Sequence, residues 1–193
     1  MCTVNVCRFS AEMCGLLSKL SDKDCFNYIV SFDFTSLVET FVETIDFGLF
    51  SNYTVYRKPA AKLSKQGRHS GGILCLIRNS LVPFVRKLNS DNDLFIFFLF
   101  DKALSDITKD VYVYAYVMPQ GSPYYNVFEV ESGIELLEEC WSDISLSLDD
   151  VYVILCGDLN GRTSNRFCYT SSRVHHARLW RMSQYLDVLR TRH

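Results

Sequence analysis

Two polar residues at the end of an apolar run are the first candidates for chemistry in this chain. Residues 151–161 read V-Y-V-I-L-C-G-D-L-N-G, so Asp158 and Asn160 follow a predicted strand and stand two positions apart. Residues two apart in an extended segment project to the same side, at the strand end where open α/β sheets bind ligands. A carboxylate there can take a proton from water or hold a divalent cation, and a carboxamide can donate to a phosphoryl oxygen. The same G-D-x-N-G residues also suit an Asx-rich turn.

Three further segments place polar side chains at strand ends or in loops. An apolar strand ends at Glu39, whose carboxylate suits Mg²⁺ or simply occupies a solvated rim. Tyr116 lies near the end of the tyrosine-striped stretch 111–117, where its phenol could hydrogen-bond a phosphate or pack in a core. Residues 66–72 read Q-G-R-H-S-G-G and open directly into a strand, so Arg68 is a candidate to bind a substrate phosphate. A single glycine-rich loop is a weak signal by itself.

The order of these motifs along the chain is more specific than any one of them. A strand followed by E-T comes first, then G-R-x-S-G-G ahead of a strand, then Y-x-x-P-x-G-S-P-Y, and finally G-D-L-N-G-R-T. This series resembles the endonuclease/exonuclease/phosphatase superfamily, and within it the endonuclease domains of non-LTR retrotransposons. The resemblance extends from about residue 16 to residue 163, which is most of the chain.

The resemblance implies a role for each candidate. It implies that Glu39 binds a catalytic Mg²⁺ or Mn²⁺ and that Tyr116 assists at the phosphate. It implies that Asp158 is the general base for an attacking water and that Asn160 supports the transition state. The first strand of the family ends in an Asn, which points to Asn5 in T-V-N-V-C as a substrate-binding residue. Elsewhere the first motif departs from the family pattern, because a Glu precedes the M-C-G-L segment where the family carries its Asn.

These residues need a framework of strands and helices to bring them together. Apolar or alternating runs predict strands over 32–38, 73–77, 81–85, 94–100, 111–117 and 151–156, with a hairpin-like turn at 78–80. A capping pattern, S-D-K-D, predicts a helix over 25–30. A second helix is predicted over 128–146, with Ile134, Leu137, Trp141 and Ile144 on one apolar face.

The predicted fold class is α/β (α+β), a four-layer sandwich of two packed, mostly antiparallel sheets with helices outside. The resemblance also implies further closing strands, a late Asp and a terminal S-D-H-type His, and these elements are not recognisable after Arg162. We therefore expect a C-terminally truncated fold, with a domain over 1–163 and a basic, helical or irregular tail over 164–193. The histidines of the tail lie in no matching context and are interpreted as solvated.

Composition limits the partners that the chain can have. Hydrophobic residues make up 48% of the 193 residues and the net charge is −2, so a core can form but no global field attracts a polyanion. DNA binding through the phosphate backbone would depend on a metal or on local cations such as Lys58, Lys62 and Lys65, which also suit a solvated face. None of the eight cysteines has the C-x-x-C spacing of a zinc site. Neither a signal peptide nor a run of about 18 apolar residues is visible, so an intracellular protein of the nucleus or cytoplasm, not secreted and without a membrane, is expected.

Two functions remain open from the sequence. The first is metal-dependent hydrolysis of phosphodiester bonds, as in a DNA endonuclease that nicks its target. The second is a catalytically inactive, truncated fragment that acts at most as a weak nucleic-acid-binding or interaction module.

Overall fold

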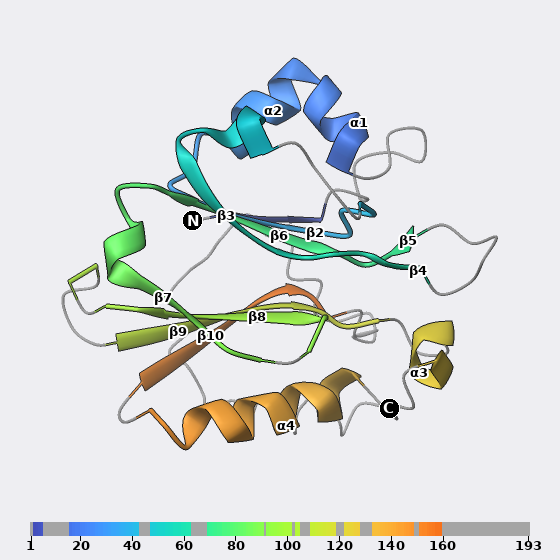
Figure 1. The fold of residues 1–193 in the computed structure, drawn as a ribbon, viewed down its shortest axis with the longest axis vertical. Coiled ribbons are helices and arrows are strands. Elements are labelled where there is room, and N and C mark those ends of the chain that lie inside the picture. Colours follow the sequence, from blue (N-terminus) through green and yellow to red (C-terminus); the bar gives the residue numbers. More distant parts are fainter. Residues whose placement is uncertain are drawn as a thin grey trace, which may run out of the picture.

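Two four-stranded sheets stacked face to face form the centre of the molecule, seen here in a computed structural model (Figure 1). The structure describes residues 2–5, 16–42, 47–62, 69–90, 92–101, 103–104, 109–118, 122–127, 133–148 and 151–159. Helices lie on the outer side of each sheet. The predicted four-layer α/β sandwich is therefore confirmed.

The strand order places parallel pairs at one side of each sheet. The first sheet has the order β1 (Cys2–Asn5), β2 (Phe34–Val38), β6 (Ile73–Arg78), β3 (Tyr53–Lys58). The second sheet has the order β10 (Val151–Asp158), β9 (Lys109–Tyr116), β8 (Phe95–Phe100), β7 (Val85–Leu88). A short ribbon pairs β4 (Ala61–Lys62) with β5 (His69–Ser70). Because β1 runs parallel to β2 and β10 parallel to β9 while the remaining pairs are antiparallel, the prediction of mostly antiparallel sheets also holds.

The helices cover the outer faces of the two sheets. Helices α1 (Leu16–Ser21) and α2 (Lys23–Ile29) lie over the first sheet, and α4 (Gly133–Ser145) lies under the second (Figure 1). The short helix α3 (Pro123–Val127) and the 3₁₀ turns η1 (Phe47–Phe50) and η2 (Val82–Phe84) complete the described elements. The N-cap of α2 is Asp22, one residue later than the capping pattern suggested, and its carboxylate accepts from the backbone N–H groups of Asp24 and Cys25.

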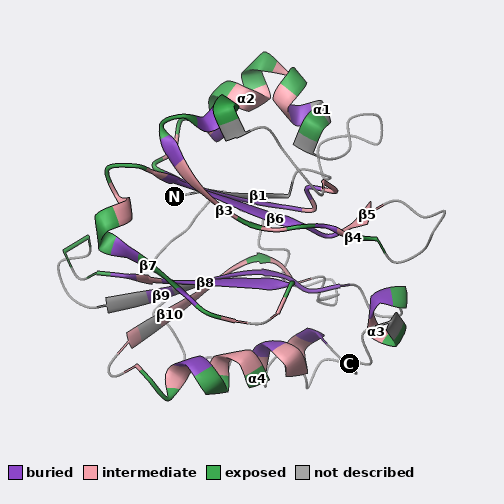
Figure 2. Cartoon of the chain, viewed as in Figure 1, coloured by how far each residue is buried: buried purple, intermediate pink, exposed green. Residues whose placement is uncertain are grey.

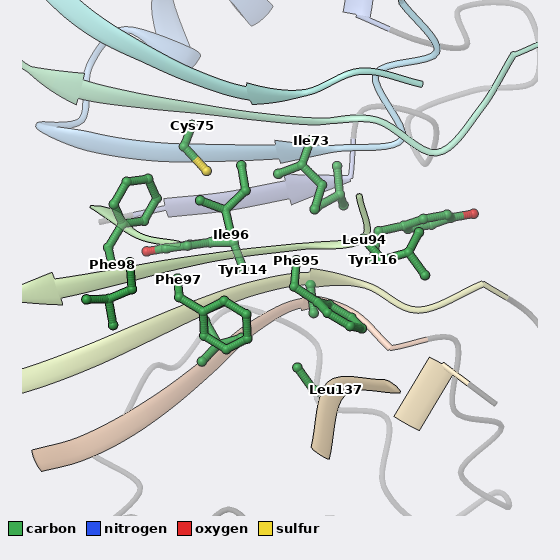
Figure 3. Close-up of a cluster of buried hydrophobic side chains, with 14 of the residues drawn as sticks. Ile73, Cys75, Leu94, Phe95, Ile96, Phe97, Phe98, Tyr114, Tyr116 and Leu137 are labelled. Carbon is green, nitrogen blue, oxygen red and sulfur yellow. The ribbon is translucent and has the colours of Figure 1, made fainter. Parts of the chain in front are cut away.

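Aromatic side chains fill the space between the sheets. Phe34 of β2 stacks on Tyr114 of β9 with ring centroids 5.0 Å apart, and Phe98 of β8 meets both rings edge-on. Figure 3 shows Phe98 and Tyr114 in this core. The other face of the second sheet packs on α4 through Leu137, which is fully buried. Both faces of the second sheet are therefore covered, and purple buried residues run along β8 in Figure 2. This arrangement confirms that 94–100 is a strand buried on both faces.

The predicted strand over 81–85, joined to 73–77 by a hairpin, is wrong. After β6 the chain leaves the first sheet, forms η2 and begins β7 at Val85 in the second sheet. Pro83 explains the difference, because proline has no N–H to donate to a strand ladder and suits the first turn of a helix. The segment 78–81 thus connects the two sheets instead of closing a hairpin.

The strand that leads to the first candidate residues also differs from its prediction. The described side chains of β10 are half-buried or exposed, although the apolar run predicted a buried strand. In the described part of the chain β10 is the outermost strand of its sheet and pairs with β9 alone, so one edge stays uncovered. The segment expected to be a tail, 164–193, lies outside the described residues, so the division into two domains stays a prediction.

Candidate active site

The carboxyl ends of four strands meet at one end of the sandwich. In the first sheet Asn5 of β1 pairs with Val38 of β2, and in the second Asp158 of β10 pairs with Tyr116 of β9. Both pairs are parallel, so the members of each pair end together. Strands β1 and β2 also contact β10 across the sandwich. Polar residues that follow or end these strands are therefore brought to one place.

A hydrogen bond between the two sheets joins two of the predicted site residues. Tyr116 Oη donates to Glu39 Oε1 over 2.7 Å, linking the last residue of β9 to the residue directly after β2. Tyr116 is 4% exposed and Glu39 is half-buried. Figure 3 shows the Tyr116 ring at the end of the inter-sheet core with its hydroxyl pointing away from that core. A hydrogen bond to a carboxylate in such partial burial is stronger than one between neutral groups, so it can fix both side chains.

Asp158 lies beside this pair on the neighbouring strand. It occupies the ladder position opposite Tyr116, and its carbonyl accepts the N–H of Val117 over 2.9 Å. Gly157 precedes it with φ +124°, and any Cβ there would overlap the carbonyl oxygen of Ala115. Only glycine fits this close approach. The glycine of the G-D motif is thus required by the backbone.

The donor set at this end of the sandwich suits a hard divalent cation. A carboxylate offers two oxygens, so Glu39 can accept the Tyr116 hydrogen bond and still coordinate an ion. Mg²⁺ is commonly held by one or two carboxylates together with water and phosphate oxygens. In the described ranges no group of three or more His, Cys, Asp or Glu could hold a metal.

The remaining predicted site residues are only partly visible. Asn5 ends β1 and pairs with Val38, and its substrate-binding role stays a prediction. Asn160 and Arg68 lie outside the described residues, and so their roles stay predictions. The structure therefore brings together Glu39, Tyr116 and the backbone of Asp158.

The sequence did not identify the residues that support this end of the sandwich. In the loop Gly71–Gly72, the Gly72 carbonyl accepts the N–H of Thr40, and a side chain on Gly71 would press on the Tyr116 ring. Thr40 itself is 2% exposed. Tyr125 Oη donates to the carbonyl of Met118 over 2.5 Å, and burial raises the pKa of Tyr125. The S-G-G letters were a usable signal for the loop, whereas nothing in the sequence pointed to Tyr125.

The chain is similar to known proteins in its fold and not in its sequence. No family model matches the chain, and no curated protein matches it. An AP endonuclease from Archaeoglobus fulgidus aligns at 18% identity and a TM-score of 0.48, covering 82% of this chain and 56% of that chain. TDP2 from Caenorhabditis elegans aligns at 13% identity with a TM-score of 0.43, covering 81% of this chain and 45% of that chain. The human Nocturnin catalytic domain with bound sulfate anion aligns at 13% identity with a TM-score of 0.44, covering 81% of this chain and 63% of that chain.

These neighbours have the endonuclease/exonuclease/phosphatase fold. The present chain spans between 45% and 63% of their lengths. With identities below 25% and TM-scores below 0.5, the likeness carries no assignment of function, which has to be inferred from the residues of this chain. No helix in the described ranges is both long and apolar enough to cross a membrane.

Proposed function

We propose that this chain hydrolyses phosphodiester bonds in DNA with the help of a divalent cation, as a nicking endonuclease of the retrotransposon type. The observation that carries the proposal is the 2.7 Å hydrogen bond from Tyr116 to Glu39 across the two sheets, with Asp158 at the ladder position opposite Tyr116. Two carboxylate residues and a phenol from three strands at one sandwich end provide the groups that phosphodiester hydrolysis needs.

Each of these residues has a distinct part in the proposed reaction. Asp158 takes a proton from water, whose oxygen attacks the phosphorus while the bond to the leaving sugar oxygen breaks. The leaving oxygen takes up a proton from solvent and becomes a hydroxyl. Glu39 would hold the Mg²⁺ (or Mn²⁺), and the cation would supply positive charge against the charge that develops on the phosphate. Tyr116 donates its phenol hydrogen to Glu39 and so fixes the carboxylate. Asn160, as an amide two positions after the base, is proposed to donate to a phosphoryl oxygen.

Cations near this end of the sandwich support a polyanionic substrate. Lys58 ends β3 and pairs with Ile73, which in turn pairs with Val38, so Lys58 lies at the same end of the first sheet as Glu39. Its Nζ donates to the carbonyl of Ser90 over 3.1 Å, and Lys62 on β4 is exposed. Contacts of lysines with phosphates contribute affinity without sequence preference.

Nicking of supercoiled plasmid DNA tests the proposal. The wild type is expected to convert supercoiled to open-circular plasmid in Mg²⁺ or Mn²⁺. Asp158→Asn is expected to lower the rate by about 10²–10⁴-fold, because it removes the general base. Glu39→Gln is expected to lower it by about 10²-fold or more, because it removes the charge that holds the cation. Tyr116→Phe, which keeps the ring and removes only the hydroxyl, should lower the rate less than either.

Matched substitutions on α4 separate chemistry from general damage. Glu139→Gln and Asp143→Asn make the same changes at exposed positions of that helix, and both should nick as the wild type does. A folded wild type that nicks no plasmid in either metal would contradict the proposal and favour an inactive nucleic-acid-binding or interaction module. Nicking that survives both Glu39→Gln and Asp158→Asn would contradict the assigned roles and point to a contaminating nuclease.

A further inference from the structure

The side chain of Glu39 lies on the side of the first sheet that strand alternation does not predict. Along β2, Phe34 and Val38 belong to the core between the sheets, whereas Leu37 belongs to the cluster shared with Ile29 of α2. Because successive strand residues point to opposite faces, Glu39 would join Leu37 on the helix side. Its carboxylate instead meets Tyr116 of the second sheet. The backbone must therefore change direction at this residue.

An extra residue in the ladder between β2 and the chain before β6 produces this change. The last regular pair is Val38 with Ile73. The next backbone hydrogen bonds run from Thr40 N–H to the Gly72 carbonyl over 3.3 Å and from Phe41 N–H to the Gly71 carbonyl over 3.1 Å. Glu39 is thus left over, as in a β-bulge, which re-aims a side chain. Its φ is +58°, a left-handed conformation that residues with a Cβ rarely adopt.

The two glycines opposite the bulge have no side chain, and this geometry leaves no room for one. A Cβ on Gly72 would overlap Thr40 Oγ1 and come within 3.2 Å of Ala60 Cβ. A Cβ on Gly71 would lie 3.1 Å from Met118 Cε and 3.3 Å from Tyr116 Cδ1. A side chain on this dipeptide would therefore press on the neighbour of Glu39 or on the ring of its partner. Both glycines also have positive φ, +73° and +92°, so a side chain at either position would strain the backbone.

We propose that Gly71 and Gly72 are positioning residues, which hold the Glu39 bulge and the Tyr116 ring so that carboxylate and phenol meet. Gly72 receives the backbone of Thr40 and excludes any side chain that would push Thr40, and with it Glu39, away from the second sheet. Gly71 does the same for the Tyr116 ring. The consequence for catalysis rests on the proposed function, whereas the consequence for the Glu39–Tyr116 hydrogen bond does not.

Fluorine NMR of the metal-free full chain, labelled with 3-fluorotyrosine, tests the positioning without any need for activity. The Tyr116 signal is assigned by its loss in Tyr116→Phe, and Glu39→Ala gives its position when the hydrogen bond is absent. Gly72→Ala is expected to move the signal toward the Glu39→Ala position. Adding Thr40→Ala to Gly72→Ala removes the overlapping hydroxyl and should move the signal back toward the wild type. Ile29→Ala, a buried change under α2, should lower stability and leave the signal in place.

The nicking assay gives the catalytic half of the test. Gly72→Ala should lower kcat by about 10- to 100-fold, as small misplacements of reacting groups do, while KM for plasmid stays within about twofold of the wild type. If Gly72→Ala does not fold, Gly71→Ala is used, because the atom nearest to its added Cβ is the flexible end of Met118, with the Tyr116 ring next. A folded glycine variant whose Tyr116 signal stays in place, or moves only as in Ile29→Ala, overturns the positioning role. A wild type that does not nick while the NMR signals move as expected overturns the proposed function alone.

Discussion

At the scale of single residues, the candidate site depends on a backbone conformation that strand geometry does not favour. Glu39 adopts φ +58° and Phe41 adopts φ +55°, and left-handed residues with a Cβ are disfavoured by roughly 1–2 kcal/mol each. Contacts from other parts of the chain must offset this, among them the backbone bonds to Gly71 and Gly72 and the Tyr116 hydrogen bond. Such strain is found where function holds a side chain in place.

Cys75 carries a second residue-scale consequence, for stability at high pH. It is fully buried between the sheets, where its Sγ donates to Ser36 Oγ over 3.6 Å, and burial raises the pKa of the thiol to about 12. In the unfolded chain this thiol has its ordinary pKa of 9.0, so the folded chain binds more protons between pH 9 and 12. Stability from the neutral thiol is complete below pH 9 and is lost as pH rises toward 12.

The prediction is that Cys75→Ala flattens the alkaline limb of the stability curve. The wild type should lose up to about 1.4 kcal/mol more per pH unit than the variant above pH 9, the slope for one proton. Urea unfolding at steps from pH 8 to 11 measures this difference. Because both chains share all other titrating groups, those contributions cancel in the comparison. Equal slopes would mean that the thiol ionises in the folded chain as it does in the unfolded one.

At the scale of elements, the sequence was most informative where strands are apolar on both faces. The runs that became β8 and β9 could be recognised because each is covered by the other sheet and by α4. Strands β3 and β7 lie at the sheet edges, and their sequences Y-T-V-Y-R-K and V-R-K-L mix charged and apolar residues. An edge strand needs fewer buried side chains, so its signal in the sequence is weak, and β3 was missed.

The amphipathic pattern of α4 leads to a prediction at this scale. Leu137 is fully buried against the second sheet, whereas Leu146, just after the helix, is 89% exposed. Leu137→Ala should lower the free energy of unfolding by about 2–5 kcal/mol, because it leaves a cavity under the sheet. Leu146→Ala makes the same change in solvent and should stay within about 0.5 kcal/mol of the wild type. Urea denaturation followed by circular dichroism compares the two variants. Similar losses of unfolding free energy in both would contradict the packing of Leu137 against the sheet.

At the scale of the whole molecule, what the sequence left undetermined is the alignment of one sheet on the other. Family order alone could name Glu39, Tyr116 and Asp158, because their motifs are read locally. The hydrogen bond between Glu39 and Tyr116 joins residues 77 positions apart and depends on how the aromatic core stacks the sheets. The bulge at Glu39 depends on a loop more than 30 residues later in the chain. Neither has a local pattern, so both required the folded chain.

A site shared between two sheets should couple cation binding to the stability of the entire sandwich. A cation that binds the folded chain alone stabilises it by RT ln(1 + [L]/Kd), about 2.7 kcal/mol at a concentration 100-fold above Kd. Because about 1 kcal/mol raises Tm by about 2–4 °C in a chain of this size, Mg²⁺ should produce a measurable rise in the wild type. Glu39→Gln should abolish most of that rise, since it removes the carboxylate that the Tyr116 hydrogen bond presents. Glu139→Gln, on the exposed side of α4, should keep the rise in Tm.

Thermal melts in Mg²⁺ and in NaCl of equal ionic strength measure the part of the Tm shift that is specific to Mg²⁺. An equal rise in all three chains would show that the cation acts on the general charge of the protein and not between the two sheets.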